Sequence, residues 1–161
     1  MRKTHATKRS LLPESLISWG RYLYWAELMF RHWDSYMEKG SDAGKALPEF
    51  IGVSSYWGAS LYVVIEGWET AQFKDPIIDA LLAVSNYKDV LRNLRNATFH
   101  YQLTLISPKI VEFFKSPEVT SWLYFIHKEF CRWLRDHVDA LERGLISEAE
   151  KQHWRQSFAE L

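Results

Sequence analysis

"PESLISWGRYLYWAELMFRHWDSYMEK", residues 13–39, is the stretch that decides the fold class of this chain. Its apolar residues alternate steps of three and four, which is the spacing of one side of an α-helix. One stripe comprises Leu16, Trp19, Leu23, Ala26, Phe30, Trp33 and Met37, and a second stripe beside it comprises Tyr22, Trp25, Met29 and Tyr36. The remaining side, which we expect to face water, comprises Gly20, Tyr24, Glu27, Arg31, Asp34 and Glu38. Two adjoining apolar stripes predict a helix that packs on more than one neighbour, in a bundle or at a subunit interface.

The helical pattern continues through the rest of the chain. A second helix is predicted from about Pro48 to Thr70, with a core face of Phe50, Trp57, Leu61, Val64 and Trp68 and an opposite, less apolar face of Ser55, Ala59, Tyr62, Glu66 and Glu69. Asp75 is a typical N-cap for a short helix, and "SP" at 107–108 and "SPEV" at 116–119 open two further helices. We find no convincing strand pattern. The sequence therefore predicts an all-α fold, an antiparallel helical bundle.

Length and charge limit the class of protein. The 161 residues suit a single domain, which we place at residues 11–161 after a disordered basic tail at residues 1–10. Because 20 Lys and Arg balance 20 Asp and Glu, only a local patch would bind a polyanion, either the tail or Lys88, Arg92 and Arg95. The single cysteine, Cys131, excludes an internal disulfide, and the apolar runs are far shorter than the ~20 residues that span a bilayer. We expect a cytoplasmic protein that does not enter a membrane.

The stretch "YKDVLRNLRNATFHYQ", residues 87–102, carries the strongest functional pattern. On a helical wheel one side gathers Tyr87, Val90, Leu94, Ala97 and Tyr101, and the other gathers Arg92, Arg95, Asn96, Phe99 and His100. Arginine offers a bidentate cationic fork to phosphate oxygens, and histidine exchanges a proton near neutral pH. These residue types suit phosphate chemistry. The alternative is a solvated helix face whose terminal histidine is favoured by the helix dipole.

Neighbouring residues leave similar alternatives open. Glu66, beside Tyr62 on the second helix, would either pair with Arg92 or Arg95 or remain a plain surface carboxylate. The aromatic side chains of Phe99 and Tyr101 would stack on bases or pack against the protein.

The segment "RNATFH", Arg95 to His100, resembles the R-x4-H motif of HEPN domains, in forms that place a polar residue directly after the arginine. HEPN domains are small all-α bundles that usually form homodimers, and many are metal-independent endoribonucleases, including toxins and abortive-infection proteins. The resemblance covers residues 48–143 or so. It implies a homodimer, an RNA substrate, an antitoxin partner for a toxin, and Arg95, Asn96 and His100 as catalytic residues. Other members of the family bind RNA, nucleotide or a protein partner without cleaving anything.

The resemblance also implies a mechanism. His100 would take the 2′-hydroxyl proton as that oxygen attacks the adjacent phosphorus, and Arg95, aided by Arg92, would stabilise the charge on the phosphate. Asn96 would position the phosphate or the imidazole. In HEPN toxins that are silenced by nucleotidylation, the modified tyrosine lies two positions after the histidine. Here Gln102 occupies that position, so we do not expect this regulation.

Two further patterns are interpreted as carrying no chemistry. "RWLRDH", Arg132 to His137, also matches R-x4-H, but its helix continues to bury Val138, with His137 on the core face and Arg132 toward solvent. His127 lies four residues before Cys131, a spacing that can hold a metal, yet no further ligand is suggested nearby. The sequence also lacks a glycine-rich phosphate loop and an H-E-x-x-H motif. We therefore expect no metal and no cofactor.

Overall fold

The computed structural model describes residues 14–38, 47–84, 86–104 and 107–142. These residues form α-helices and no strand, which confirms the predicted all-α class. The helices are α1 (Glu14–Glu38), α2 (Leu47–Thr70), α3 (Pro76–Ala83), α4 (Tyr87–Phe99), α5 (Pro108–Phe114) and α6 (Pro117–Glu142). None of these helices combines the length and the apolar character that crossing a membrane requires. The predicted tail at residues 1–10 and the last part of the predicted domain lie outside the described residues.

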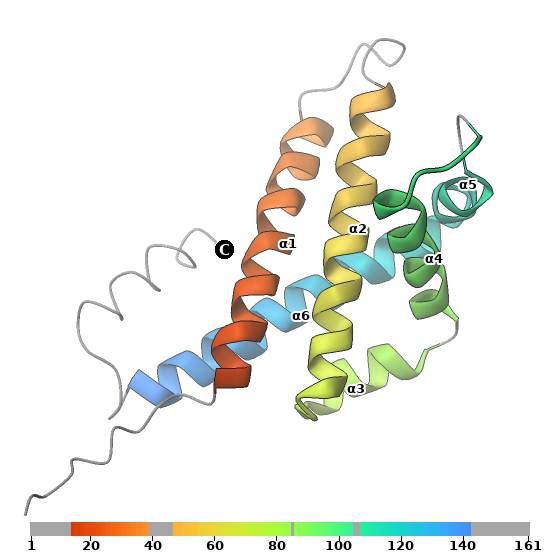
Figure 1. The fold of residues 1–161 in the computed structure, drawn as a ribbon. Helices are drawn as coiled ribbons and strands as arrows, with labels where there is room; N and C mark the ends of the chain where they lie inside the picture. Colours follow the sequence, from red (N-terminus) through yellow and green to blue (C-terminus); the bar gives the residue numbers. More distant parts are fainter. Residues whose placement is uncertain (1–13, 39–46, 85, 105–106, 143–161) are drawn as a thin grey trace, which may run out of the picture.

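Helix α2 is the central element of the fold. It runs antiparallel to α1 on one side and packs against α4 on the other, while α6 crosses behind α1 and α2 (Figure 1). The less apolar face of α2, opposite the predicted core face, is therefore also buried at Ser55, Ala59 and Tyr62. Gly58 lies on that same side. A Cβ atom there would come within 2.6 Å of Leu94 Cδ2, so the Leu94 side chain packs directly on the backbone of α2 at this glycine.

Aromatic side chains from three helices fill the centre of the core. The ring of Trp19 on α1 lies 5.7 Å from Trp68 on α2 and 5.4 Å from Trp133 on α6, and its indole N–H donates to the carbonyl of Val64 at 2.9 Å. Such tilted and edge-on pairs stabilise the core beyond the burial of their area. The predicted apolar stripe of α1 is buried from Leu16 to Phe30, whereas Met37, near the end of the helix, is exposed.

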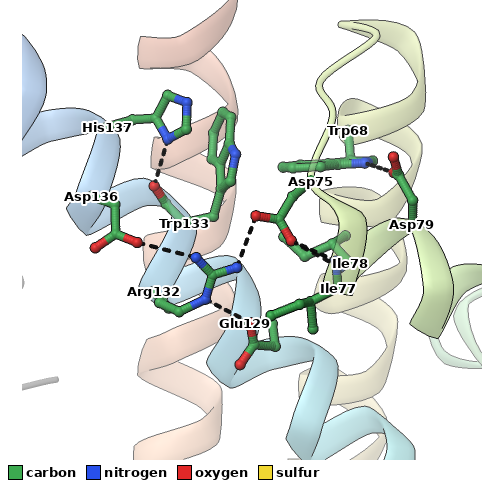
Figure 2. A network of polar contacts seen from close by, with 10 residues as sticks. All are labelled: Trp68, Asp75, Ile77, Ile78, Asp79, Glu129, Arg132, Trp133, Asp136 and His137. Carbon is green, nitrogen blue, oxygen red and sulfur yellow. Dashed lines mark hydrogen bonds and ion pairs between the residues drawn. The ribbon is translucent and has the colours of Figure 1, made fainter.

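The second R-x4-H match joins α6 to the start of α3 (Figure 2). Asp75 accepts hydrogen bonds from the backbone N–H groups of Ile77 and Ile78, as the predicted N-cap should. Its other oxygen lies 2.9 Å from Arg132 Nη2. Arg132 also pairs with two acids on its own helix, Glu129 and Asp136.

The expected positions of this second pair were therefore wrong. Arg132 is half-buried among carboxylates, because Asp75 of α3 reaches it across the helix junction. His137 is exposed, and its ring stacks on Trp133 with 3.8 Å between ring centroids. Arg132 thus serves the packing of α3 on α6, whereas His137 contacts its own helix.

The double role of Asp75 gives a stability prediction. Asp75→Ala removes both the cap and the ion pair, and we expect it to lower the free energy of unfolding by about 1–2 kcal/mol in urea denaturation. Asp75→Asn keeps a capping acceptor and loses only the charge, so it should be destabilised less. Equal stability of Asp75→Ala and the unchanged protein would contradict this account of the α3–α6 junction.

Candidate functional site

Helix α4 is held by its apolar side and carries the candidate site at its end. Val90, Leu94 and Ala97 are buried, as predicted, and Leu91 joins them. Tyr101 was expected on the same side, but 92% of it is exposed. The reason is that the helix ends at Phe99, so the wheel no longer applies two residues later.

Arg95 is positioned by two residues of α2. Its Nη2 donates to Glu66 Oε1 at 3.3 Å, and its guanidinium lies over the ring of Tyr62 at 5.2 Å from the centroid. These contacts realise one of the alternatives for Glu66, a pairing with Arg95. The arginine is half-buried. Its Nε–H is buried and has no hydrogen-bond partner within the described residues, so the donors that remain for an anionic ligand are on the terminal nitrogens.

His100 is the residue at which the chain leaves α4. Its backbone is extended, with φ −117° and ψ 137°, and its N–H donates to the carbonyl of Asn96 at 3.2 Å. Gln102 Nε2 donates to the His100 carbonyl at 2.7 Å, which stabilises the turn away from the helix. The imidazole belongs to an exposed residue. Arg95 and His100 share the end of α4, but no hydrogen bond joins them within the described residues.

The remaining site residues lie around this helix end. Asn96 is half-buried. Phe99 is 52% exposed and packs edge-on against Tyr56 of α2, with 5.7 Å between centroids. Phe99 thus contacts the protein with one side of its ring and leaves the rest open to solvent.

The predicted basic patch on α4 is neutralised by nearby acids. Lys88 pairs with Glu69 at 2.6 Å, Arg92 pairs with Asp89 one turn earlier, and Arg95 pairs with Glu66. A surface of paired charges has a weaker field than three free cations would have. A phosphate bound here would compete with carboxylates for the guanidinium groups.

A second polar cluster lies in the interior, where the sequence suggested none. Glu27 was expected on the water-facing side of the first helix, yet it is 2% exposed and lies 2.8 Å from His127 Nε2. Arg31, one turn later, donates to its other oxygen at 3.0 Å. The prediction was wrong because the 3–4 spacing that buries Leu23 and Phe30 also passes through Glu27. The signal in the sequence was a carboxylate at the same helical spacing as the buried apolar stripe.

Glu27 also completes a set of potential metal ligands. Its carboxylate, a ring nitrogen of His127 and the thiol of Cys131 lie within 4.8 Å of one another. We expected no further potential ligand near His127 and Cys131, and the position of Glu27 shows that this expectation was wrong. All three residues are buried.

The tautomer of His127 argues against a metal at this cluster. Trp57 Nε1 lies 3.1 Å from His127 Nδ1, and an indole N–H can only donate. Nδ1 must then be the acceptor, so Nε2 carries the proton and donates to Glu27. A metal on Nε2 would require the proton to move to Nδ1, against the Trp57 N–H. The residues present fit a hydrogen-bonded network better than a metal centre.

The ionisation of the cluster follows from its burial and its partners. Burial disfavours charge and lowers the pKa of His127, and the nearby Glu27 offsets this only in part. Burial alone would raise the pKa of Glu27, but hydrogen bonds from His127 and Arg31 outweigh it and the net pKa is lowered. Burial, with the Glu27 charge, raises the pKa of Cys131 to about 12. The cluster is thus a neutral imidazole and thiol around a carboxylate paired with Arg31.

Comparisons of this chain with models of protein families, with curated proteins and with solved structures gave no match.

The shifted pKa values predict acid-sensitive stability. Because His127 has a lower pKa folded than unfolded, the unfolded chain binds its proton first, and stability falls as pH drops below about 6.5. Glu27, also lowered, adds a further loss below about 4.5. Urea unfolding between pH 7 and 4 measures the slope. His127→Gln, which retains a donor and an acceptor, should reduce the change of the free energy of unfolding with pH near pH 6.5. His137→Gln, at the surface, should not. An unchanged slope in His127→Gln would refute the assignment.

The tautomer argument predicts that Co²⁺ does not bind the Glu27 cluster. Added Co²⁺ should give neither a thiolate–metal charge-transfer band nor a rise in melting temperature. Cys131→Ser should behave in the same way. A band that is lost in Cys131→Ser would show that the network rearranges to hold a metal.

Proposed function

We propose that the end of α4 is the working part of a metal-independent endoribonuclease of the HEPN-like kind. The observation that carries the proposal is the helix end itself. His100 leaves α4 on extended backbone and is exposed, five residues after an arginine that Glu66 and Tyr62 hold in place. An imidazole and a guanidinium on one helix end are the groups that RNA transesterification needs.

In the proposed mechanism two copies of the chain bring their α4 ends together. His100 of one copy withdraws the 2′-hydroxyl proton, and that oxygen attacks the adjacent phosphorus. The bond to the 5′ oxygen breaks, the second copy's His100 protonates this leaving group, and a cyclic phosphate remains. Arg95 and Arg92 stabilise the charge on the non-bridging oxygens, and Asn96 positions the phosphate. The need for a 2′-hydroxyl restricts the reaction to RNA.

The side chains around the helix end have supporting roles in this proposal. Glu66 and Tyr62 orient Arg95, while Phe99 and Tyr101 stack on bases beside the scissile phosphate. As a biological role we propose a toxin or phage-defence component acting on cytoplasmic RNA, with an antitoxin protein as the partner that restrains it.

The test is cleavage of single-stranded RNA with EDTA present. We expect His100→Ala and Arg95→Ala to lower the cleavage rate by about 100-fold or more, because each removes a group that acts in the transition state. His137→Ala, in the second R-x4-H match, is the matched control and should cleave normally. The proposal is wrong if His100→Ala cleaves as fast as the unchanged protein, or if EDTA abolishes cleavage.

The pairing of every α4 cation with an acid favours one alternative, a non-catalytic HEPN-like module that binds RNA, nucleotide or a protein partner. For RNA or nucleotide, this alternative predicts binding without cleavage. The affinity would fall with added salt and with Arg92→Ala or Arg95→Ala. Growth arrest on expression, relieved by His100→Ala, would instead support the ribonuclease.

A further inference from the structure

A hollow of about 710 Å³ lies where the end of α2 turns into α3. Its apolar side is made by Trp68, Phe73 and Leu82, and the two aromatic rings pack on each other with 5.7 Å between their centroids. The polar part of the lining comes from both helices and from the turn between them, and comprises Glu69, Gln72, Lys74 and Asp79. The junction of α2 and α3 lies away from the end of α4 that carries the candidate site (Figure 1).

The charges that line this hollow are not all paired, unlike the cations of α4. Both oxygens of Glu69 lie 2.6 Å from Lys88 Nζ, so this acid is already neutralised. The Asp79 carboxylate accepts one long hydrogen bond among the described residues, from the Trp68 indole N–H at 3.3 Å (Figure 2). Since a carboxylate has about four acceptor positions, most of those of Asp79 stay open. Lys74 is exposed and has no ion-pair partner in the part of the chain that the structure describes.

One open anion and one open cation therefore line the same hollow. Asp79 and Lys74 are five residues apart, and within the described ranges no ion pair joins them. Their two charges balance, so the complementary ligand is a zwitterion, with an ammonium that donates to Asp79 and a carboxylate that accepts from Lys74. The C-terminal end of α2 lies at the same hollow, and its partial negative charge also favours an ammonium there.

Gln72 lines the hollow in a backbone conformation that favours glycine. Helix α2 ends in a Schellman motif, in which the N–H of Phe73 donates to the carbonyl of Trp68 at 3.2 Å and that of Gln72 donates to the carbonyl of Glu69 at 3.1 Å. Gln72 occupies the left-handed position of this motif, with φ 56°. Strained positions of this kind cluster at binding sites. The side-chain amide of Gln72 both donates and accepts, so it can add a contact to a carboxylate held by Lys74.

We propose that this hollow binds a free α-amino acid with an apolar side chain. Asp79 holds the ammonium, Lys74 and Gln72 hold the carboxylate, and the side chain lies on Phe73 and Leu82. The hollow is within the roughly 300–1,000 Å³ of small-molecule sites, and like them it joins an apolar surface to a few polar groups. The site is separate from the proposed ribonuclease and does not rest on it.

The experiment is an NMR titration of the isotope-labelled full chain with L-phenylalanine. We expect saturable shifts of the backbone amides of Gln72, Phe73 and Asp79. N-acetyl-L-phenylalanine lacks the ammonium and L-phenylalaninamide lacks the carboxylate. Each analogue should bind about tenfold more weakly or worse, because each leaves one charge of the hollow without its partner.

Two substitutions remove the charges and keep the fold. Asp79→Asn retains an oxygen that accepts from Trp68, and Lys74→Gln alters an exposed side chain, so each should weaken L-phenylalanine binding about tenfold without unfolding the protein. Glu118→Gln on α6 and Lys109→Gln on α5 are the matched controls, since both residues are exposed and neither lines the hollow. The controls should bind as tightly as the unchanged protein.

Gln72→Gly separates binding from stability. Glycine adopts the left-handed conformation without strain, so we expect the melting temperature to rise by about 2–4 °C. Loss of the amide should at the same time raise the Kd for L-phenylalanine severalfold. A purely structural role of Gln72 does not predict a gain in stability together with a loss of affinity.

Three outcomes would overturn the inference. The first is the absence of saturable shifts with L-phenylalanine at millimolar concentrations. The second is L-phenylalaninamide binding as tightly as L-phenylalanine, which would identify a site for organic cations and reject the zwitterion. The third is an affinity that neither Asp79→Asn nor Lys74→Gln changes relative to the two controls.

Discussion

The buried hydrogen-bond chain from Trp57 through His127 to Glu27 is the constraint on which the arrangement of the long helices depends. Trp57 of α2 donates to His127 of α6, which donates in turn to Glu27 of α1, and Arg31 donates to the other oxygen of Glu27. Buried polar groups are costly unless every one is paired, so removing any member leaves another without a partner. Apolar packing tolerates small shifts between helices, but these bonds hold over only a few tenths of an ångström. The chain thereby specifies how α6 crosses the other two.

The same network shows why a set of suitable ligands need not be a metal site. Distances alone bring a carboxylate, an imidazole and a thiol together. The direction of the Trp57 N–H then fixes which imidazole nitrogen carries a proton, and that proton occupies the position a metal would need. Burial works in the same direction, since it raises the pKa of Cys131 to about 12 and keeps the thiol protonated. The surroundings of the three groups therefore matter more than their separation.

The candidate site joins the fold through α2. Glu66 and Tyr62, on the side of α2 that meets α4, hold the Arg95 guanidinium, and Leu94 packs closely on Gly58 on the same side. Each cation of α4 is already paired with an acid, so little net positive charge is left on this surface. Such a surface suits the precise placement of one phosphate, or contact with a neutral protein face, better than attraction of a long polyanion.

The sequence alone determined the all-α class and the main helices, because apolar spacing and capping residues such as Asp75 are local signals. The helical wheel, however, ran through Tyr101, two residues beyond the end of α4 at Phe99. Only the tertiary structure decided where burial extends beyond the predicted apolar faces. Ser55 and Tyr62 are covered because α2 has neighbours on several sides, and Glu27 is buried because distant Trp57 and His127 supply its partner and orient it. Arg132 likewise finds Asp75 across the chain. These outcomes depend on contacts between residues far apart in sequence, which no local periodicity records.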